Sequence, residues 1–301
     1  MKRLLTLLMA LAMTASLAAC GGTGSSGDTA DSGNSGTTAE GGETAGSSGV
    51  EDGVLTIAME CAYAPYNWSQ SDDSNGAVPI SNVPGTYANG YDVMIAKQIC
   101  EANGWELEVV QSDWDSLVPG VQTGTFDAVI AGQSITAERA AQVAFSVPYY
   151  YASIVTLTKK DSAYASAASV ADLAGATATS QLGTIWYDTC LPQIENANLL
   201  PAQESAPAML VALNSGACDI VVTDRPTAQA ALVAYPDFTL LDFGGGDSDF
   251  KVSEEDINIG ISMKKGNTAL QSAINEVLST MTADDYNAMM DDAISAQPLS
   301  K

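Results

Sequence analysis

The sequence contains no histidine and few basic residues, and both shortages exclude classes of function. Without histidine, the chain has no Ser-His-Asp or Cys-His catalytic arrangement and none of the common zinc motifs. It has 11 lysine and arginine residues against 36 aspartate and glutamate residues, a formal net charge of −25. Because nucleic acids and anionic lipids attract basic proteins, this charge argues against both as partners. We expect neither a metal ion nor a cofactor.

Cysteine is also scarce, and its spacing carries no motif. Besides Cys20, the chain has four cysteines, and none of them forms a Cys-x-x-Cys motif: Cys61, Cys100, Cys190 and Cys218. Two of them, Cys61 and Cys218, stand beside runs typical of strands, and we interpret them as buried free thiols. A disulfide among the four is the open alternative, because disulfides persist in exported proteins.

The first 49 residues are predicted to lie outside the folded body. Residues 1–20 have a charged start, an apolar run and small residues before a cysteine, as in a secretory signal. The apolar run is too short for a membrane-spanning helix. Residues 21–49 hold only Gly, Ser, Thr, Ala, Asp, Glu and Asn, and we expect a flexible, disordered linker.

The end of the signal segment, Leu17-Ala18-Ala19-Cys20, resembles a bacterial lipobox. The resemblance implies cleavage before Cys20 and its lipidation, with palmitate among the acyl chains. Firm anchoring takes more than one chain, which lipoprotein processing supplies. We therefore expect a lipid-anchored protein of the cell membrane that faces the extracellular or periplasmic side. A secreted protein without lipid is the alternative.

Arginine occurs three times, and Arg139 follows a buried run that ends in Gly132. Guanidinium is the side chain best shaped to grip a carboxylate through two parallel hydrogen bonds. Gly132 lets a ligand approach the backbone, and Ser134 offers a hydroxyl and an N–H. These residues predict a carboxylate site at the end of the strand 126–131. A surface ion pair of Arg139 is the alternative.

A second stretch, residues 216–224, repeats this arrangement. A glycine precedes a short apolar strand, and Asp224 stands at its carboxyl end. Ligands in open α/β sheets bind outside the carboxyl ends of the strands. Asp224 and Arg139 therefore offer opposite charges for a zwitterion, and an α-amino acid is the obvious candidate.

Hydrophobic patterning predicts alternating strands and helices after residue 50. Strands are expected at 54–59, 107–110, 126–131, 154–159, 177–179, 219–222 and 257–263. Helices are expected at 92–103, 117–123, 206–214, 226–234, 268–281 and 283–294, and in the region 185–191. This is an α/β pattern with mostly parallel sheets.

Two extended crossings, near 152–158 and 255–262, indicate that one lobe interrupts another. We expect lobe 1 over residues 50–155, lobe 2 over 156–256 and a return to lobe 1 over 257–301. Residues 67–89 are rich in Asn, Ser, Gly and Pro and are predicted as a long loop. This loop either caps the cleft or decorates lobe 1.

Three motifs carry a resemblance to a known family. They are Gly90-Tyr91-Asp92-Val93-Met94-Ile95-Ala96-Lys97, Ser134-Ile135-Thr136-Ala137-Glu138-Arg139 and Phe145-Ser146-Val147-Pro148-Tyr149-Tyr150. Over about residues 50–301, the chain resembles the amino-acid-binding solute receptors of bacterial ABC transporters, although Met94 stands where an acidic residue is usual. The resemblance implies the two-lobed periplasmic-binding-protein fold. Each lobe is then a mixed, mostly parallel sheet flanked by helices, and two hinge strands join the lobes.

The resemblance also implies how the ligand carboxylate is held. Ser134 and Arg139 bind it from lobe 1. A loop of lobe 2 that contains Gln181, Thr184 and Ile185 offers backbone N–H groups at a helix start, where anions bind readily.

The same resemblance implies which residues contact the ammonium group and the side chain of the ligand. The carbonyl of Gly132 and the carboxylate of Asp224 receive the ammonium group. Tyr63 and Trp114 are the aromatic walls around the side chain, although each could instead pack in the core. Glu60 stands where relatives that bind polar or cationic amino acids keep an acidic residue; a solvated loop position is its alternative.

The implied function is a binding protein and not an enzyme. It captures a free amino acid, polar or cationic, by hinge closure and delivers it to a membrane permease. We expect a monomer. Two alternatives stay open: a cyclohexadienyl-type dehydratase on the same fold, with Glu60 as its acid, and a ligand-sensing surface lipoprotein without a transporter.

Overall fold

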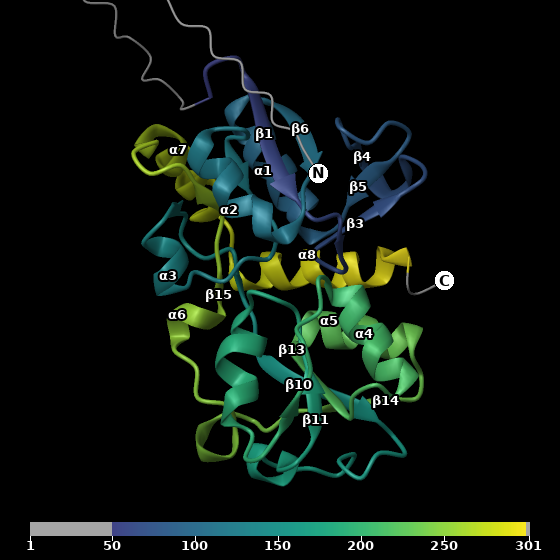
Figure 1. Cartoon of the computed structure of the whole chain (residues 1–301). Helices are drawn as coiled ribbons and strands as arrows, with labels where there is room; N and C mark the ends of the chain where they lie inside the picture. Colours follow the sequence, from purple (N-terminus) through teal and green to yellow (C-terminus); the bar gives the residue numbers. More distant parts are fainter. Residues whose placement is uncertain (1–49, 299–301) are drawn as a thin grey trace, which may run out of the picture. The chain divides into compact units, whose positions relative to one another are not determined.

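Two five-stranded sheets form the cores of two lobes in a computed structural model that describes residues 50–298 (Figure 1). These residues belong to one compact unit. The predicted signal segment 1–20, its Cys20 and the linker 21–49 lie outside the described residues.

The sheet of lobe 1 has the strand order β6-β1-β7-β16-β8. Its strands are β1 (Val54–Met59), β6 (Glu106–Gln111), β7 (Ala128–Val129), β8 (Ala144–Phe145) and β16 (Ser262–Met263). Around it lie α1 (Tyr91–Asn103), α2 (Trp114–Thr123), α3 (Ala137–Ala140) and α7 (Thr268–Leu278). The apolar spacing of α1 buries Ile95 and Ile99, and Gly104 ends this helix with a φ of 69°.

The sheet of lobe 2 has the order β12-β11-β13-β10-β14. Its strands are β10 (Ile154–Lys159), β11 (Thr177–Thr179), β12 (Asn198–Leu199), β13 (Ile220–Asp224) and β14 (Phe238–Leu241). Its helices are α4 (Ala206–Ser215), α5 (Arg225–Ala234) and α6 (Glu254–Ile257), with a π-helical turn at Trp186–Cys190. Short 3₁₀ turns occupy Ser74–Gly76, Val170–Leu173, Leu191–Gln193 and Gly246–Ser248.

Both sheets are mixed, with more antiparallel pairing than we expected. In the described residues, each sheet has two parallel and two antiparallel pairs of strands. The parallel strands end at the cleft, whereas β10 and β16 enter their sheets from the hinge. A strand that enters a sheet at its cleft edge runs opposite to the strands that end there. Each crossing of the chain between the lobes therefore adds antiparallel pairs.

The hinge is a small antiparallel sheet of its own. In it, β9 (Tyr150–Tyr151) pairs with β15 (Asn258–Ile259). The expected continuous strand 257–263 is therefore wrong: β15 belongs to the hinge and β16 to lobe 1, and the chain changes sheets between them. At the other crossing, Ile154 already pairs with Asp224, two residues before the predicted start of lobe 2.

Residues 67–89 form strands instead of the predicted loop. The antiparallel order is β2-β3-β5-β4, with β2 (Ala62–Tyr63), β3 (Asn67–Gln70), β4 (Val78–Pro79) and β5 (Tyr87–Asn89). This small sheet packs on lobe 1, where Ile80 pairs with Val109 of β6. It therefore extends lobe 1, and its first strand carries Tyr63 to the cleft, where β2 also contacts α4 of lobe 2.

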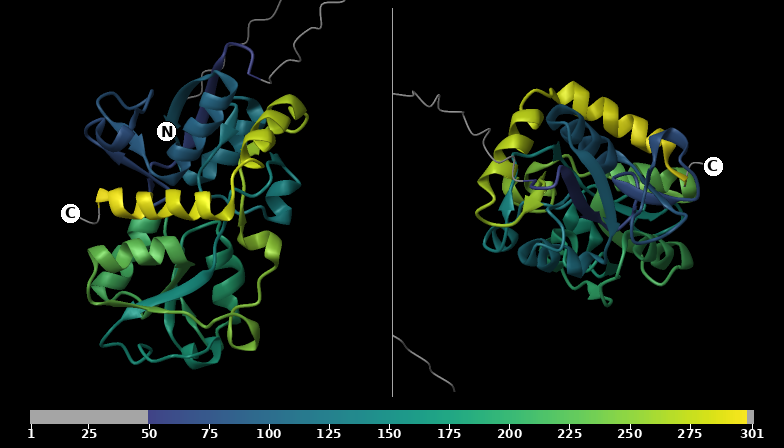
Figure 2. Two further views of the ribbon diagram at one scale, coloured as in Figure 1. Left: turned by 180° about the vertical axis from the view of Figure 1, so that it is seen from behind. Right: turned by 90° about the horizontal axis from the view of Figure 1, so that it is seen from above.

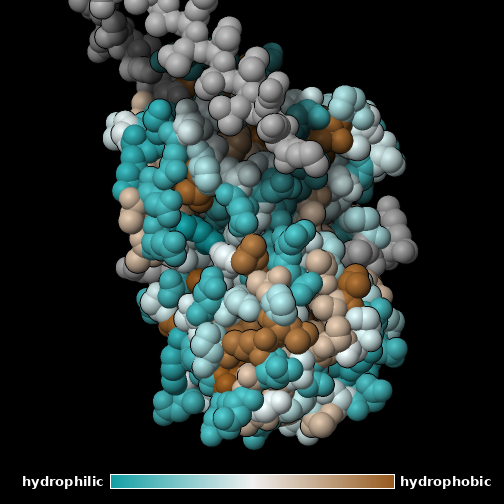
Figure 3. All heavy atoms as spheres, viewed as in Figure 1, coloured by the Kyte–Doolittle hydropathy of each residue, from teal (hydrophilic) through white to brown (hydrophobic). Residues whose placement is uncertain are grey.

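The last helix, α8 (Ala283–Ala296), lies across both lobes (Figure 2). It starts at a capping box of Thr282 and Asp285 and contacts α1 of lobe 1 and α5 of lobe 2. None of the helices in the described residues is long and apolar enough to span a membrane. Figure 3 shows mainly hydrophilic side chains on the visible face of lobe 1, and a hydrophobic cluster on that of lobe 2.

Candidate ligand-binding site

A small cavity lies where the carboxyl ends of strands from both sheets meet. Eight of the predicted site residues line it: Tyr63, Trp114, Gly132, Ser134, Arg139, Gln181, Thr184 and Ile185. Its volume is about 10 Å³, which is room for about one water molecule. The cavity is therefore too small to hold an amino acid in this conformation.

Arg139 is hydrogen-bonded to both lobes. It lies in α3, where the Thr136 side chain caps the helix start. Its Nη1 donates to the Ser134 carbonyl at 2.9 Å, and its Nη2 donates to the Gly183 carbonyl of lobe 2 at 2.8 Å. The guanidinium carbon lies 5.2 Å from the ring centre of Trp114. Burial lowers the pKa of Arg139 to about 10, so it stays charged at neutral pH.

Glu60 comes directly after β1 and faces the lobe 2 loop. It is 7% exposed, and its two carboxylate oxygens accept from Gln181 Nε2 at 3.3 and 3.2 Å. Burial, with smaller contributions from Asp113 and Asp115, raises the pKa of Glu60 to about 7. Glu60 is not in the wall of the small cavity but lines a wider opening next to it.

Asp224 has a structural role that the sequence did not suggest. It is the N-cap of α5: its carboxylate accepts from the Thr227 N–H at 2.9 Å and from the Thr227 hydroxyl at 3.0 Å. It also accepts from the Tyr63 hydroxyl across the cleft. Burial raises the pKa of Asp224, which is 1% exposed and outside the wall of the small cavity. An ammonium group would therefore share this carboxylate with Tyr63 and Thr227.

The lobe 2 loop leads into a helical segment, as expected. Thr184 and Ile185 precede a π-helical turn at Trp186–Cys190 that continues directly into the 3₁₀ turn Leu191–Gln193. The Thr184 hydroxyl donates to the Gln181 carbonyl at 2.7 Å. The predicted contact of a ligand carboxylate with the N–H groups at this helical start stays a prediction.

The predicted site residues omit Trp186 in the cavity wall and Gly183 beside it. Trp186 lines the cavity, is 7% exposed and has its ring centre 6.1 Å from that of Tyr63. Its place directly after Ile185 was the available signal. Gly183 supplies the carbonyl that Arg139 bonds across the cleft, and its φ of 64° favours glycine. The other face of Tyr63 stacks on Tyr66, with ring centres 4.8 Å apart.

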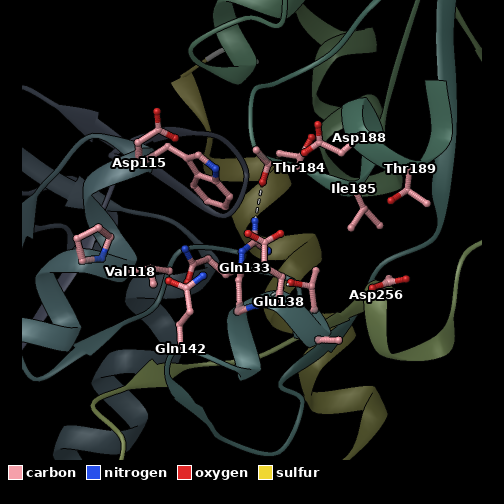
Figure 4. A pocket seen from close by; sticks show the side chains of 16 residues that line it. Asp115, Val118, Gln133, Glu138, Gln142, Thr184, Ile185, Asp188, Thr189 and Asp256 are labelled. Atoms are coloured by element: carbon pink, nitrogen blue, oxygen red, sulfur yellow. Dashed lines mark hydrogen bonds between the residues drawn. The ribbon is translucent and has the colours of Figure 1, made fainter. Parts of the chain in front are cut away.

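Two acidic openings lead toward the cavity, one on each side of Trp114. Each has a volume of about 520 Å³. The first, drawn in Figure 4, brings Asp115 and Glu138 of lobe 1 opposite Asp188 of lobe 2. The second contains Glu60, Asp113, Asp115 and Glu204. Such a surface concentrates cationic solutes near the cleft.

The cysteines and acidic residues form no further centre in the part of the chain that the structure describes. Cys61, Cys100, Cys190 and Cys218 are all buried free thiols. Within residues 50–298, no group of three or more His, Cys, Asp or Glu side chains is arranged to hold a metal ion.

Comparison with known proteins finds relatives among amino-acid receptors. The "ABC transporter arginine-binding protein 1" of Escherichia coli is 29% identical over 198 residues, 65% of this chain and 76% of that protein. The "L-cystine-binding protein TcyJ" of E. coli is 26% identical over 78% of this chain and 79% of its own length. The arginine-binding extracellular protein ArtP of Bacillus subtilis is 33% identical, over 46% of this chain and 49% of that protein.

Solved structures give the same fold. The substrate-binding protein AbpA of Streptococcus pneumoniae, bound to L-arginine, has a TM-score of 0.68 and 25% identity, and covers 81% of this chain and 96% of its own. An ancestral amino-acid-binding protein, described as a precursor of cyclohexadienyl dehydratase, has a TM-score of 0.65 and 28% identity over the same shares.

The family model of the bacterial extracellular solute-binding proteins, family 3, matches residues 55–294. This range contains both sheets, the hinge and all the predicted site residues except Cys20. The predicted two-lobed fold is confirmed by these similarities. The chain therefore belongs to the bacterial extracellular solute-binding proteins, family 3.

Proposed function

We propose that the chain is the receptor that captures a free amino acid for an ABC transporter. The observation that carries this proposal is Arg139, whose guanidinium donates to one carbonyl of each lobe beside the shared cavity. A ligand carboxylate is a better acceptor than either carbonyl, because it is charged and accepts two parallel bonds. A ligand carboxylate would take the place of these carbonyls on Arg139. Its contact with the N–H groups of the lobe 2 loop would then hold the two lobes together.

The ammonium group completes the contacts of the zwitterion. We assign it to the Gly132 carbonyl of lobe 1 and the Asp224 carboxylate of lobe 2. A ligand that contacts both lobes binds the closed form better than the open form and shifts the hinge equilibrium toward it. No covalent bond changes in this cycle. The closed form is then recognised by a membrane permease.

We propose that the ligand side chain is polar, and cationic or amide-bearing rather than aliphatic. Glu60 is buried and accepts hydrogen bonds only from the Gln181 amide among the described residues. Such a carboxylate is stabilised by a ligand donor, whereas an aliphatic side chain would leave it poorly paired. The aromatic rings of Tyr63 and Trp114 suit a flat guanidinium or amide. Arginine- and histidine-binding proteins among the relatives support the same ligand class.

A thermal-shift screen tests this function. The twenty standard amino acids, ornithine and citrulline are added singly, because a ligand that binds only the folded form raises its melting temperature. We expect the largest shifts from cationic or amide-bearing ligands, followed by calorimetry on the best of them. If none shifts the transition, the receptor proposal fails; if leucine or valine shifts it most, only the side-chain assignment fails.

We propose that a lipid on Cys20 anchors this receptor outside the cell membrane. If residues 21–49 form the flexible linker expected from their composition, its about 29 residues span roughly 30 Å on average, and the anchor and the binding site should act independently. Cys20→Ser is therefore expected to move the protein from the membrane fraction to the soluble fraction while its ligand affinity stays unchanged. Retention in the membrane fraction would contradict lipidation at this residue.

A dehydratase is the second candidate, and one observation favours it. Burial raises the pKa of Glu60 to about 7, which suits a general acid near neutral pH. Incubation with prephenate, with Glu60→Gln as the control, distinguishes the two: turnover that the substitution abolishes would establish an enzyme. A sensor without a transporter is the third candidate, and neighbouring permease and ATPase genes would argue against it.

A further inference from the structure

A buried hydrogen-bond network in lobe 1 centres on Asp92. This residue lies in the first turn of α1 and is fully buried. Its Oδ2 accepts from Asn67 Nδ2 at 2.8 Å, and its Oδ1 accepts from the Tyr149 hydroxyl at 2.6 Å. Neither of the ion pairs found in the described residues includes Asp92. Its carboxylate is therefore held by these two neutral side chains, and the backbone N–H of Gly132 stabilises it as well.

Each partner passes the network on to a backbone N–H at the ligand cleft. Asn67 Oδ1 accepts from the Cys61 N–H at 2.8 Å. The Tyr149 hydroxyl accepts from the Gly132 N–H at 3.1 Å. Cys61 directly follows Glu60, and Gly132 lines the small cavity. One carboxylate thus connects two loops that are far apart in the sequence.

The two anchored residues share an unusual backbone conformation. Cys61 has a φ of 55° and Gly132 a φ of 62°, both in the left-handed region. A non-glycine residue such as Cys61 keeps this conformation only where its surroundings fix it. At Gly132 a side chain has no room, since a Cβ would lie 2.6 Å from Tyr63 Cε1. The network therefore bonds each loop at the residue with the left-handed backbone conformation.

We propose that Asp92 is a positioning residue of the binding site. Through Asn67 and Tyr149, it fixes the backbone of two of the lobe 1 segments that meet the ligand, so that Glu60 and the Gly132 carbonyl are oriented before the ligand arrives. Asp92 itself does not touch the ligand. Its effect on affinity rests on the proposed function, whereas its effect on the two loops does not.

Amide hydrogen exchange tests the network without any ligand. Tyr149→Phe removes the arm to Gly132, Asn67→Ala removes the arm to Cys61, and Asp92→Asn disturbs both by replacing an acceptor oxygen with a donor. We expect about tenfold faster exchange at the disconnected amide, as for the loss of one buried hydrogen bond. Tyr149→Phe should affect Gly132 alone, Asn67→Ala should affect Cys61 alone, and Asp92→Asn should affect both.

Tyr91→Phe is the matched control. Tyr91 is as fully buried as Tyr149 and stacks on it, with ring centres 5.8 Å apart, but its hydroxyl donates to the Tyr149 carbonyl and not to either loop. This variant loses a buried hydrogen bond of similar kind. It should leave the exchange of Cys61 and Gly132 unchanged relative to that of Ile57 in β1. An equal acceleration at all these amides would mean general destabilisation and would overturn the proposal.

Calorimetry with L-arginine on the same variants then tests the consequence for the site. We expect Tyr149→Phe to weaken binding about five- to tenfold and Tyr91→Phe to leave it unchanged. In the Asp92→Asn background, Tyr149→Phe should add little. Faster loop exchange without weaker binding would overturn the positioning role. A wild-type protein that binds no amino acid would contradict the proposed function, and the exchange result would still decide the network.

Discussion

Each lobe places a buried aspartate at the start of a helix, but the two carboxylates are held differently. Asp92 of lobe 1 is fully buried and bonded by Asn67 and Tyr149, which both lie outside lobe 2. Asp224 of lobe 2 caps α5 through Thr227 and also accepts from Tyr63, which belongs to the other lobe. The side chains that bond Asp92 thus all belong to its own lobe, whereas one of those that bond Asp224 lies across the cleft.

This difference suggests that the two lobes contribute to binding in different ways. Most of the side chains proposed to select the ligand belong to lobe 1, and Asp92 is proposed to position two of its loops. Lobe 2 contributes a short loop and a helix cap, whose free acceptor capacity depends on where Tyr63 lies. A ligand would then bind to a preorganised lobe 1 first, and lobe 2 would complete the site on closure. The substitutions below test this comparison.

Arg139→Ala is expected to have the largest effect. Arg139 joins both lobes, and the loss of a buried partner of a charged group costs roughly 2–5 kcal/mol of binding free energy. We therefore expect about 30- to several-thousand-fold weaker amino-acid binding by calorimetry. An unchanged dissociation constant would remove Arg139 from the site.

The only other arginine in residues 50–298 provides the control. Arg225 forms an ion pair with Asp242 on the surface, where both side chains are more than a third exposed. Exposed pairs of this kind contribute little to stability. Arg225→Ala should therefore leave ligand affinity unchanged, and a large loss would show that arginine substitution acts through the fold.

Asp224→Asn is expected to have the next largest effect. Asparagine is as good an N-cap as aspartate, so the start of α5 should survive while the negative charge is lost. Binding of amino acids should weaken about 10- to 100-fold, since a hydrogen bond to a charged group is lost. Analogues without the α-amine should be nearly unaffected in calorimetry.

Asp92→Asn, tested with the same two kinds of ligand, compares the aspartate of lobe 1 with that of lobe 2. If Asp92 positions the Glu60 and Gly132 loops, its substitution should weaken the binding of deaminated analogues as well, through Glu60, and should weaken amino acids somewhat more, because their ammonium group also meets the Gly132 carbonyl. Asp224→Asn should separate the two ligand types. An equal loss for both in Asp224→Asn would reduce Asp224 to a helix cap.

The fold was predictable from the sequence where apolar and β-branched residues follow one another without interruption. The bounds of β1, β10 and β11 are those expected, because each is a short run of apolar and β-branched residues. Residues 67–89 were read as a loop because their polar, Gly- and Pro-containing composition hides the strand pattern. Their pairing depends on long-range contacts such as that of Ile80 with Val109, which no local window contains.

The motifs predicted which residues lie at the site, but not which hydrogen bonds those residues form with one another. The resemblance named eight of the nine residues around the cavity and missed Trp186. It gave no sign that Gln181 bonds Glu60 or that Asp224 caps α5, because both depend on how the lobes and helices meet. The roles of these residues toward a ligand stay predictions that the substitutions test.

The smallest expected change in affinity is the pH dependence caused by Glu60. Burial raises its pKa to about 7, so near neutral pH the carboxyl group is partly protonated. A cationic ligand binds the deprotonated form and must displace the proton at lower pH. Affinity for L-arginine should therefore fall about tenfold between pH 8 and pH 6. Most of this dependence should vanish in Glu60→Gln; if it persists unchanged there, it comes from another group, such as Asp92 or Asp224, whose pKa burial also raises.

The same group makes a prediction about stability that needs no ligand. Its folded-state pKa of about 7 lies above the ordinary value of 4.5, so the folded form binds the proton more tightly than the unfolded chain. The neutral carboxyl therefore stabilises the wild type fully below about pH 4.5, and this contribution is lost as the pH rises through 7. Glu60→Gln, whose amide is neutral throughout, should gain up to roughly 3 kcal/mol relative to the wild type by pH 8. Urea unfolding of both proteins at pH 5 and pH 8 measures this difference; parallel pH profiles would mean that Glu60 is solvated, and lobe 1 would then lack the buried carboxylate that selects a cationic ligand.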